Sequence, residues 1–370
     1  KPIILDVETS SINAYDSSSK LFFVGCYDGV SSWMDSIEFN SVPYGFKLED
    51  IQTRLDNASL LVGFAVKFDI SWLRRYGIEI NTPILALQAA EYLLSGQTAR
   101  MPSLDDCLAR RGLPPKLPFD FSVDHSEQEW RDYLSQDLIS EYLLFLEVQK
   151  DLNAGDPRLK RLVFDDSQDQ LITQEMEQNG VKYDIQRSLE MGDKLVQQIG
   201  VIDVRLKELF PFPYLNWNSN DHVSAVLYGG IIQYDVREKY DRVLKDGRIS
   251  QKEHWVTKEF HCPRQVDPLP NSDLKKPGYF KTDEATFKKL KASGLAKQVI
   301  DLLLERSKLD KKVGTYYHGI PNLYRTSNWS DEILHGQLHH CVPRTGRLSS
   351  SQPNLQNIDD EVKRLIVSRY

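Results

Sequence analysis

The sequence predicts a mixed α/β (α+β) domain followed by a mainly helical region. Residues 2–7 and 20–27 are runs rich in β-branched and aromatic side chains, and residues 60–64 form a third run of the same kind. Beyond residue 64 the spacing of apolar residues changes to the helical period. Strands followed by helices in this way are typical of a domain that combines a sheet with packed helices.

Helices are expected after the third strand. One should end at Gly77, a second should cover residues 83–94, and a third should begin after Ser103, whose sequence context forms a capping box. A second capping box at Ser126 should start a long helix that continues to about residue 150. The Gly- and Pro-containing segment 153–157 is interpreted as the linker out of the first domain.

The remaining sequence is predicted to be mainly helical. One helix should end at Asn179 and another should cover residues 184–210, and we interpret the two as an antiparallel pair. Residues 211–280 contain Pro-rich and Lys-rich pieces, so we expect loops there with at most a short hairpin. Helix should return over residues 282–326, and residues 343–358 should form a polar loop.

Composition limits the class of protein. The chain has 370 residues, of which 41% are hydrophobic and 27% charged, as in an ordinary soluble protein. Its apolar runs fall far short of the ~20 residues that a membrane-spanning helix needs, and its first residues are unlike a signal peptide. The cysteines lie far apart without a CxxC pair, which argues against a disulfide framework or a zinc ribbon: Cys26, Cys107, Cys262 and Cys341. We therefore expect a soluble protein of the reducing cytoplasm.

Charge is unevenly distributed along the chain. Residues 1–150 carry 13 basic and 22 acidic side chains, whereas residues 151–370 carry 33 basic and 31 acidic ones. An acidic module joined to a neutral or slightly basic one indicates metal chemistry in the first and contact with a polyanion in the second.

Two carboxylates stand at the end of the first predicted strand. Asp6 and Glu8 are two residues apart, so their side chains project on the same side of the strand. Because like charges this close repel, the pair would need a divalent cation, and oxygen ligands favour Mg²⁺ or Mn²⁺. Asp69 follows the next strand and is a third candidate. For each motif taken alone, the alternative is a solvated polar surface.

A Tyr and a carboxylate recur further along the chain. Tyr133 and Asp137 are four residues apart and therefore share one face of the predicted helix. In chain order, DxE on a strand, FD after a later strand and YxxxD on a late helix resemble the DEDD superfamily of 3′–5′ exonucleases, in its Tyr-containing branch. The resemblance covers roughly residues 1–150 and implies a ribonuclease H-like fold.

The resemblance also implies a chemistry. Asp6, Glu8, Asp69 and Asp137 would hold two Mg²⁺ ions, with Mn²⁺ as a possible substitute, for phosphodiester hydrolysis, and Tyr133 would orient the attacking water. One departure concerns the second motif, in which polymerase relatives commonly carry a polar pair where this chain has Phe64-Ala65. The acidic ligand is kept, so the departure puts the rate in question more than the reaction class.

The second half of the sequence has a different resemblance. The strings TGRLSS (345–350) and PNLQNI (353–358), preceded by HGQLHHC (335–341), are similar to the family A DNA polymerases of bacteria and bacteriophages. Residues 178–184 are similar to the turn between the first connecting helices of that family. The segments LYGG (227–230) and 276–294 are closest to phage enzymes.

Within this resemblance the strings are expected to grip duplex DNA. Arg347 can reach a minor-groove acceptor, which all four base pairs offer, and so can test pairing without reading sequence. Amides suit the same surface, backbone donors can meet phosphate, and lysines at the end of the thumb helix can contact phosphates. The expected DNA-binding residues are Thr345, Arg347, Gln356, Asn357, Lys311 and Lys312.

The resemblances together imply a domain organisation. We expect an exonuclease domain over 1–153, connecting helices and thumb over 154–330, and the first part of a polymerase palm over 331–370. The catalytic palm and fingers motifs of the family would lie beyond residue 370, so dNTP binding and polymerisation are expected only together with them. The expected partners are primer-template DNA, single-stranded 3′ ends and a processivity or replisome protein, with no membrane.

Two other functions are compatible with the same residues. One is a DNA-binding scaffold that keeps the exonuclease fold but has weak or no activity, which Phe64-Ala65 would permit. The other is a free-standing DEDD exonuclease, against which the TGRLSS and PNLQNI strings argue because such an enzyme has no use for them. The complete carboxylate set with Tyr133 favours an active nuclease.

Overall fold

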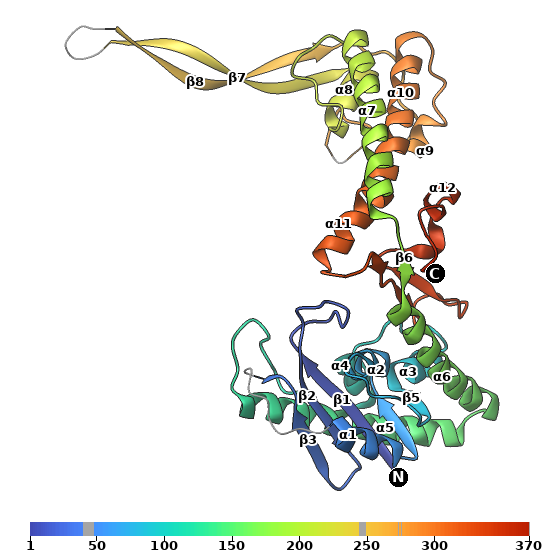
Figure 1. Cartoon of the computed structure of the whole chain (residues 1–370). Coiled ribbons are helices and arrows are strands. Elements are labelled where there is room, and N and C mark those ends of the chain that lie inside the picture. The colour runs from blue at the N-terminus through green and yellow to red at the C-terminus, as the bar shows by residue number, and fades with distance from the viewer. Residues whose placement is uncertain (40–47, 244–248, 273, 275, 370) are drawn as a thin grey trace. The chain divides into compact units, whose positions relative to one another are not determined.

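The computed structural model describes residues 1–39, 48–243, 249–272, 274 and 276–369 (Figure 1). The chain forms two compact units: the first comprises Lys1–Ser188 and Ile320–Tyr370, and the second comprises Leu189–Gly319. These units are defined by backbone contacts, and the functional boundaries expected from the sequence stay predictions. Among the described residues, no helix is both long and apolar enough to cross a membrane.

The first unit is built on a five-stranded mixed sheet. Its strands are β1 (Pro2–Thr9), β2 (Leu21–Tyr27), β3 (Ser32–Ser36), β4 (Leu60–Gly63) and β5 (Ile84–Ala86), in the order β3-β2-β1-β4-β5. β1 pairs antiparallel with β2 and parallel with β4, so it lies at the centre of the sheet. The three strands expected from the sequence are confirmed.

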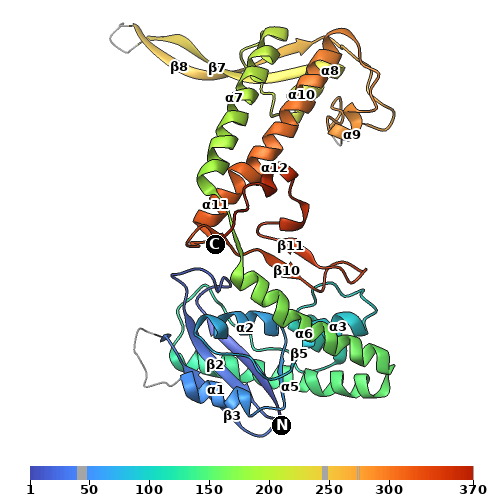
Figure 2. The same cartoon turned by 45° about the vertical axis from the view of Figure 1, so that its right-hand side comes forward.

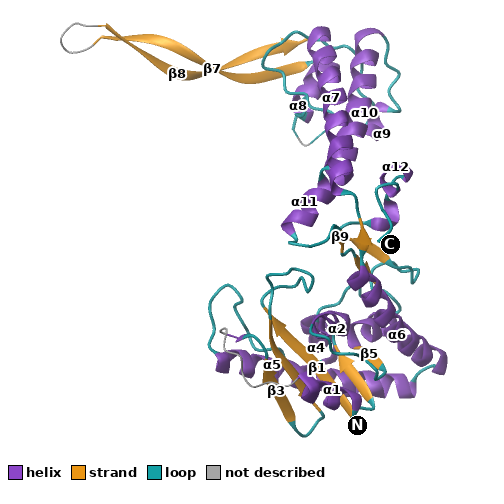
Figure 3. Cartoon of the chain, in the orientation of Figure 1, coloured by secondary structure: helices purple, strands orange, loops and turns teal. Residues whose placement is uncertain are grey.

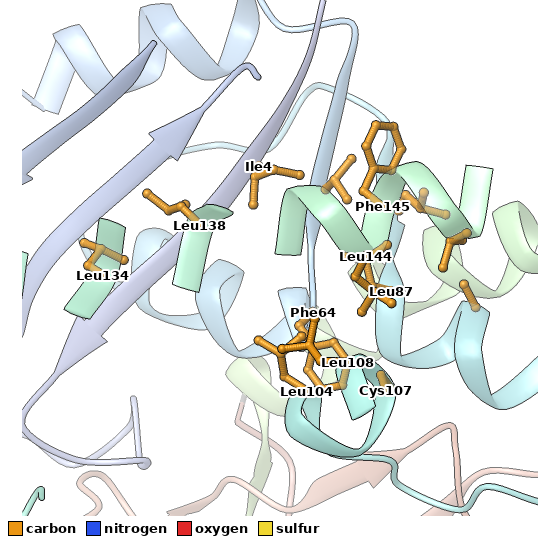
Figure 4. Close-up of a cluster of buried hydrophobic side chains, with 14 of the residues drawn as sticks. Ile4, Phe64, Leu87, Leu104, Cys107, Leu108, Leu134, Leu138, Leu144 and Phe145 are labelled. Atoms are coloured by element: carbon orange, nitrogen blue, oxygen red, sulfur yellow. The ribbon is translucent and has the colours of Figure 1, made fainter. Parts of the chain in front are cut away.

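Helices cover both faces of this sheet: α1 (Leu48–Asp56), α2 (Val66–Arg75), α3 (Leu87–Leu94), α4 (Leu104–Arg111) and α5 (Glu127–Ala154). Because side chains alternate along a strand, each strand supplies two separate cores. Figure 4 shows one of them, in which Ile4 of β1 lies among side chains that include Leu134 and Leu138 of α5. On the other face, Leu5 packs with side chains of α1 and α2 such as Ile51 and Ile70.

Capping residues set the ends of two helices as expected. Ser103 and Asp106 form a capping box at the start of α4, and Ser126 and Glu129 form one at the start of α5. In each box the serine accepts a hydrogen bond from a backbone amide that would otherwise have no partner. The α4 helix ends at Gly112, whose φ of 67° is the left-handed conformation that favours glycine.

Two expectations about helices are wrong. Residues 83–94 do not form one helix, because residues 84–86 pair with β4 as strand β5 and only Leu87–Leu94 is helical. All three residues of β5 are buried, and pairing at the sheet overrides the local helical period. The helices α6 (Pro157–Asn179) and α7 (Ile185–Leu209) are not an antiparallel pair, since α6 packs against α2, α3 and β5 while α7 lies mostly in the second unit.

The C-terminal part of the first unit contains short elements. These are β6 (Val181–Lys182), β9 (Ile333–Leu334), β10 (Gln337–His339), β11 (Ser349–Ser351), a 3-10 turn (Leu355–Asn357) and the helices α11 (Gly319–Thr326) and α12 (Asp360–Lys363). β10 pairs antiparallel with β11 and β6 pairs with β9. The expected polar loop over 343–358 is therefore partly wrong, because backbone pairing to β10 orders residues 349–351.

The second unit is a helical body with a hairpin. The helices α7 and α10 (Gly294–Lys312) lie side by side in both views and share an apolar cluster with α8 (Asn220–Tyr228) (Figures 1 and 2). A short helix α9 (Glu284–Phe287) precedes α10, and a π-helical turn at Val313–Tyr317 follows it. The helical region expected over 282–326 is thus present but interrupted.

The hairpin is the largest departure from the sequence expectation. β7 (Gly230–Val243) and β8 (Ile249–Cys262) are 14 residues each and pair antiparallel along their full length, as Figure 3 shows. The expectation of at most a short hairpin is wrong. One face of the hairpin is exposed along its length and the other is partly buried, and residues 232–237 of β7 alternate apolar and polar side chains accordingly. β8 shows no such alternation, so the two strands do not stand out as a pair in the sequence.

Candidate active site

Three carboxylates converge at the centre of the first unit. The side chains of Asp6 and Glu8 on β1 and of Asp137 on α5 place oxygens that all lie within 4.8 Å of one another. Asp6 and Glu8 lie on the same face of β1 as Ile4, and that face packs against α5. Tyr133 lies one turn before Asp137 on the same face of α5. The structure therefore brings together residues that the sequence separates by about 130 positions.

Asp69 joins the group through the backbone of β1. It lies in the first turn of α2 and is buried, and its Oδ1 accepts a hydrogen bond from the Val7 amide at 3.1 Å. Asp6 Oδ1 accepts from the same amide at 2.9 Å. One backbone donor between two carboxylates holds both oxygens close, which places all four predicted acidic ligands in one site.

Burial and mutual repulsion raise the pKa values of these carboxyl groups. Desolvation, followed by the charge of Asp137, raises the pKa of Asp6 to about 7. Desolvation and the charge of Asp6 raise the pKa values of Glu8 and Asp69 well above their usual range. Each group thus favours its neutral form unless positive charge is supplied.

The site has the chemistry of a divalent-cation site. Its donors are all carboxylate oxygens, the ligands that hard cations prefer. Asp137 Oδ1 is buried and has no hydrogen-bond partner within the described structure. A buried acceptor without a partner is costly, and a cation at this position would satisfy it. The residues present therefore fit a divalent metal ion.

Lys116 is a member of the site that the sequence did not reveal. Its Nζ lies 2.6 Å from Asp137 Oδ2 and donates to the Tyr133 hydroxyl at 3.0 Å. Burial opposes the charge of Lys116, but the hydrogen bond and charge of Asp137 outweigh it and raise the pKa of the ammonium group. A single lysine in a Pro-rich loop has no motif by which it could be recognised.

Glu141 is a fifth acidic group beside the site. It is buried, and its Oε2 accepts a hydrogen bond from the Phe64 amide at 3.1 Å, at the junction between β4 and α2. Burial, and then the charges of Asp6 and Asp69, raise its pKa. Its spacing offered a signal, because Tyr133, Asp137 and Glu141 repeat every four residues along α5.

The second-motif pair occupies two different environments. Phe64 is buried in the core shown in Figure 4. Ala65 is exposed and stands at the N-cap position of α2 without a side-chain hydrogen bond. It also lines a cavity of about 310 Å³ together with Lys67 and Phe68. The position is therefore open to an added polar side chain.

The expected DNA-binding residues are divided between the units. Arg347 and Thr345 are exposed in the turn before β11, and Gln356 and Asn357 are exposed in the 3-10 turn. Lys311 and Lys312 lie at the C-terminal end of α10 in the second unit. The structure thus leaves the first four accessible to solvent, and it does not place the two lysines with them in one unit.

Two family models match the chain. The model of the 3′–5′ exonuclease domain matches residues 1–142, and the model of DNA polymerase family A matches residues 261–369. The first range contains all the carboxylates of the site described above, and the second contains the exposed residues of the C-terminal turns.

The chain is similar to DNA polymerase I of bacteria. The chain is 27% identical over 303 residues to DNA polymerase I of Synechocystis sp., which covers 79% of this chain and 26% of that protein. It is 36% identical over 116 residues to DNA polymerase I of Deinococcus radiodurans, covering 30% and 12% of the two chains. The region matched in the first of these relatives is thus about a quarter of its length.

A solved structure has the same fold. The polymerase domain of Pol1 from M. smegmatis, in complex with DNA primer-template and dNTP, superposes with a TM-score of 0.68 at 16% identity. The superposition covers 98% of this chain and 53% of the other.

Proposed function

The chain belongs to the family A DNA polymerases with a 3′–5′ exonuclease domain, and we propose that its first domain removes nucleotides from the 3′ ends of DNA. The observation that carries this proposal is the convergence of Asp6, Glu8 and Asp137 beside Tyr133. Glu8, Asp69 and Asp137 are buried and Asp6 is half-buried. Four such carboxylates, with no His or Cys in the group, suit phosphodiester hydrolysis assisted by a hard cation.

The same residues would hold the metal. We assign Asp6, Glu8, Asp69 and Asp137 to two Mg²⁺ ions, for which Mn²⁺ could substitute, because their raised pKa values and the unpartnered Asp137 Oδ1 call for positive charge. When bound, the ions would supply the charge that activates water and stabilises the leaving 3′-oxygen.

The side chains of α5 and Lys116 perform the positioning. The Tyr133 hydroxyl accepts a hydrogen bond from Lys116 Nζ, which leaves its own proton to be donated to an acceptor in the site. Lys116 also favours the carboxylate form of Asp137 and so opposes the rise in pKa that burial causes. Tyr133 is therefore held in place to orient the attacking water.

The C-terminal segment is proposed to contact the primer-template. Thr345, Arg347, Gln356 and Asn357 are exposed and polar, which suits hydrogen bonds to phosphate and to minor-groove acceptors. Lys311 and Lys312 would contact phosphates from α10. For the complete protein we also propose polymerisation with dNTP binding and a processivity partner. We further propose a cytoplasmic location and a phage source.

A second candidate function rests on Ala65. A residue without a polar side chain at the N-cap of α2 removes one possible contact to substrate, which favours a slow exonuclease or a DNA-binding scaffold. An intact carboxylate set favours the active enzyme over this candidate.

The decisive experiment measures cleavage of single-stranded DNA labelled at either end. We expect release of nucleotides from the 3′ end in Mg²⁺ and none in a chelator. Asp137→Asn should lose cleavage, whereas Asp132→Asn, an exposed carboxylate on the same helix, should keep it. Cleavage that persists in chelator, or that begins at the 5′ end, would overturn the proposal.

A further inference from the structure

The hairpin of the second unit presents two chemically different faces. Residues directly opposite in an antiparallel pair share a face, so the register divides the side chains cleanly. We call one the tyrosine face, formed in its outer part by Tyr234, Val236, Glu238, Tyr240, Arg242, Ser250, Lys252, His254, Val256 and Lys258. The other is the acidic face, formed by residues 233, 235, 237, 239 and 241 with their partners 251, 253, 255, 257 and 259. Figure 1 shows the hairpin extending from the helices of its own unit.

The two faces carry opposite charge. The tyrosine face has three basic side chains, Arg242, Lys252 and Lys258, and one carboxylate, Glu238. The acidic face has two basic side chains and four carboxylates, which are Arg237, Lys239, Asp235, Asp241, Glu253 and Glu259. The tyrosine face is therefore the one that attracts a polyanion.

Several polar side chains of the acidic face form hydrogen bonds or ion pairs with one another. Gln233 donates to Glu259 at 3.1 Å, and Thr257 donates to Asp235 at 2.7 Å. Arg237 pairs with Glu253 at 3.7 Å and lies over the ring of Trp255, 4.8 Å from its centroid. These cross-strand contacts stabilise the hairpin and leave less charge for a ligand.

The tyrosine face leaves charge and aromatic rings available. Lys258 pairs with Glu238 at 2.5 Å, but among the described residues Arg242 and Lys252 form no salt bridge. Tyr234 stacks on Tyr214 with ring centroids 4.5 Å apart, and Tyr240 is 42% exposed. Tyr240 is thus an exposed ring between Arg242 and Lys252, whereas Tyr234 is partly buried. A ring beside unpaired cations is a feature by which proteins bind single-stranded nucleic acid, with a base on the ring and phosphates on the cations.

We propose that the tyrosine face of the hairpin binds single-stranded DNA. This inference rests on the proposed function, because it names a surface by which the same enzyme holds its DNA, but it concerns residues of the second unit and no residue of the exonuclease site. Duplex DNA fits less well, since its bases are stacked on one another and cannot lie on tyrosine rings.

The test is a binding measurement that cleavage cannot disturb. Fluorescence anisotropy of a labelled single-stranded oligonucleotide, titrated with the whole chain in chelator, gives the affinity at several salt concentrations. Arg242→Gln combined with Lys252→Gln should reduce the slope of log K against log salt by about 1.4, because each phosphate contact on single strands contributes about 0.7. Tyr240→Ala should weaken binding roughly tenfold, and Tyr240→Phe, which keeps the ring, should bind as the wild type does.

Matched controls lie on the opposite face of the same strands. Lys239→Gln removes one charge from the acidic face, and Trp255→Ala removes one exposed ring, and both should leave the affinity and the salt slope unchanged. A melting curve on every variant reports whether the chain remains folded.

Two results would overturn the inference. If the tyrosine-face variants bind as the wild type does, the face serves another ligand such as a protein. If Lys239→Gln and Trp255→Ala lose as much DNA affinity as the tyrosine-face variants do, binding is not specific to one face. Exonuclease activity separates this outcome from a failure of the proposed function. The tyrosine-face variants should keep cleavage of very short substrates, whereas Asp137→Asn should lose cleavage and keep DNA affinity.

Discussion

At the scale of single residues, the site stores electrostatic repulsion that a cation relieves. Asp6, Glu8 and Asp69 have raised pKa values, so the native state without metal binds more protons than the unfolded chain does. The contribution of such a carboxyl group to the stability of the fold is complete below its pKa in the unfolded chain, about 4. That contribution is lost as pH rises through its pKa in the folded chain, which is about 7 for Asp6.

In chelator, the free energy of unfolding should therefore fall as pH rises from 5 to about 8. Asp6→Ala combined with Glu8→Ala should flatten this dependence, abolish cleavage and not lower the melting temperature at pH 8. Mg²⁺ should raise the melting temperature of the wild type and not of the variant, since only a chain that binds the ion is stabilised by it. A variant that trims DNA at the wild-type rate would exclude the assignment.

Ala65 tests whether a polar contact is missing. Ala65→Asn places an amide at the exposed N-cap of α2, and we expect faster exonuclease turnover if that amide reaches substrate. Asparagine at an N-cap also stabilises a helix by about 1 kcal/mol relative to alanine, so stability should be measured with turnover. Ala65→Ser, which can cap but is shorter, is the control. Unchanged turnover in Ala65→Asn would show that the contact is supplied elsewhere.

Lys116 is expected to set the pH range of the exonuclease. Without its ammonium group 2.6 Å from Asp137, the pKa of that carboxyl should rise further, because burial already raises it. Lys116→Met should therefore shift the acidic limb of the rate profile to higher pH, and Lys116→Arg should restore much of the wild-type profile. A lower rate without any shift would mean that Lys116 only packs.

At the scale of elements, α5 carries the site and is stabilised from its start. Removing the Ser126 cap by Ser126→Ala should cost about 1 kcal/mol of unfolding free energy, measured by denaturant titration. Cleavage by the folded enzyme should be unchanged, because fraying is confined to the first turn and Tyr133 lies beyond it. A large loss of activity in the folded state would show that the first turn positions the site.

Elements with a buried face were predictable, and elements defined by long-range pairing were not. The strands β1, β2 and β4 and the capped helices α4 and α5 carry their signals in local spacing and in capping boxes. β5 is three residues long and exists only because β4 offers it an edge. In the β7–β8 hairpin, residues 232–237 alternate apolar and polar side chains but β8 does not, so the sequence shows at most one of the two strands and not their full-length pairing.

At the scale of the whole first unit, its C-terminal segment is joined to the exonuclease part by polar contacts. Lys67 of α2 pairs with Glu177 of α6 at 2.7 Å and also donates to the Leu338 carbonyl. Tyr92 donates to the Pro343 carbonyl at 2.8 Å, and His340 lies 3.1 Å from Asp166. These contacts explain why residues 320–370 fold with residues 1–188 as one unit.

Arg347 should separate the two activities expected of the complete polymerase. Loss of one charge-assisted contact to a base edge costs about 1–3 kcal/mol, so Arg347→Ala should reduce primer extension roughly tenfold to a hundredfold. Single-strand cleavage should hardly change, because Arg347 is exposed and contributes nothing to the carboxylate cluster. Equal loss of both activities, or of neither, would show that the turn is a general structural element.

Local spacing places Asp6 with Glu8 on one side of a strand and Tyr133 with Asp137 on one side of a helix. That these four and Asp69 share one site was implied by the resemblance to the DEDD exonucleases, not by spacing. Local spacing could not reveal Lys116, which acts through a contact with a helix distant in sequence. The four-residue spacing of Glu141 from Asp137 offered a signal, but its hydrogen bond with the Phe64 amide arises only from packing. The hydrogen bonds that Val7 donates to Asp6 and Asp69 arise only when β1 and α2 pack, and the partition of the hairpin into a basic and an acidic face arises only from its register. The residue types at these positions determine which chemistry is possible. The distances between the side chains and their burial are determined by the packing of the folded chain.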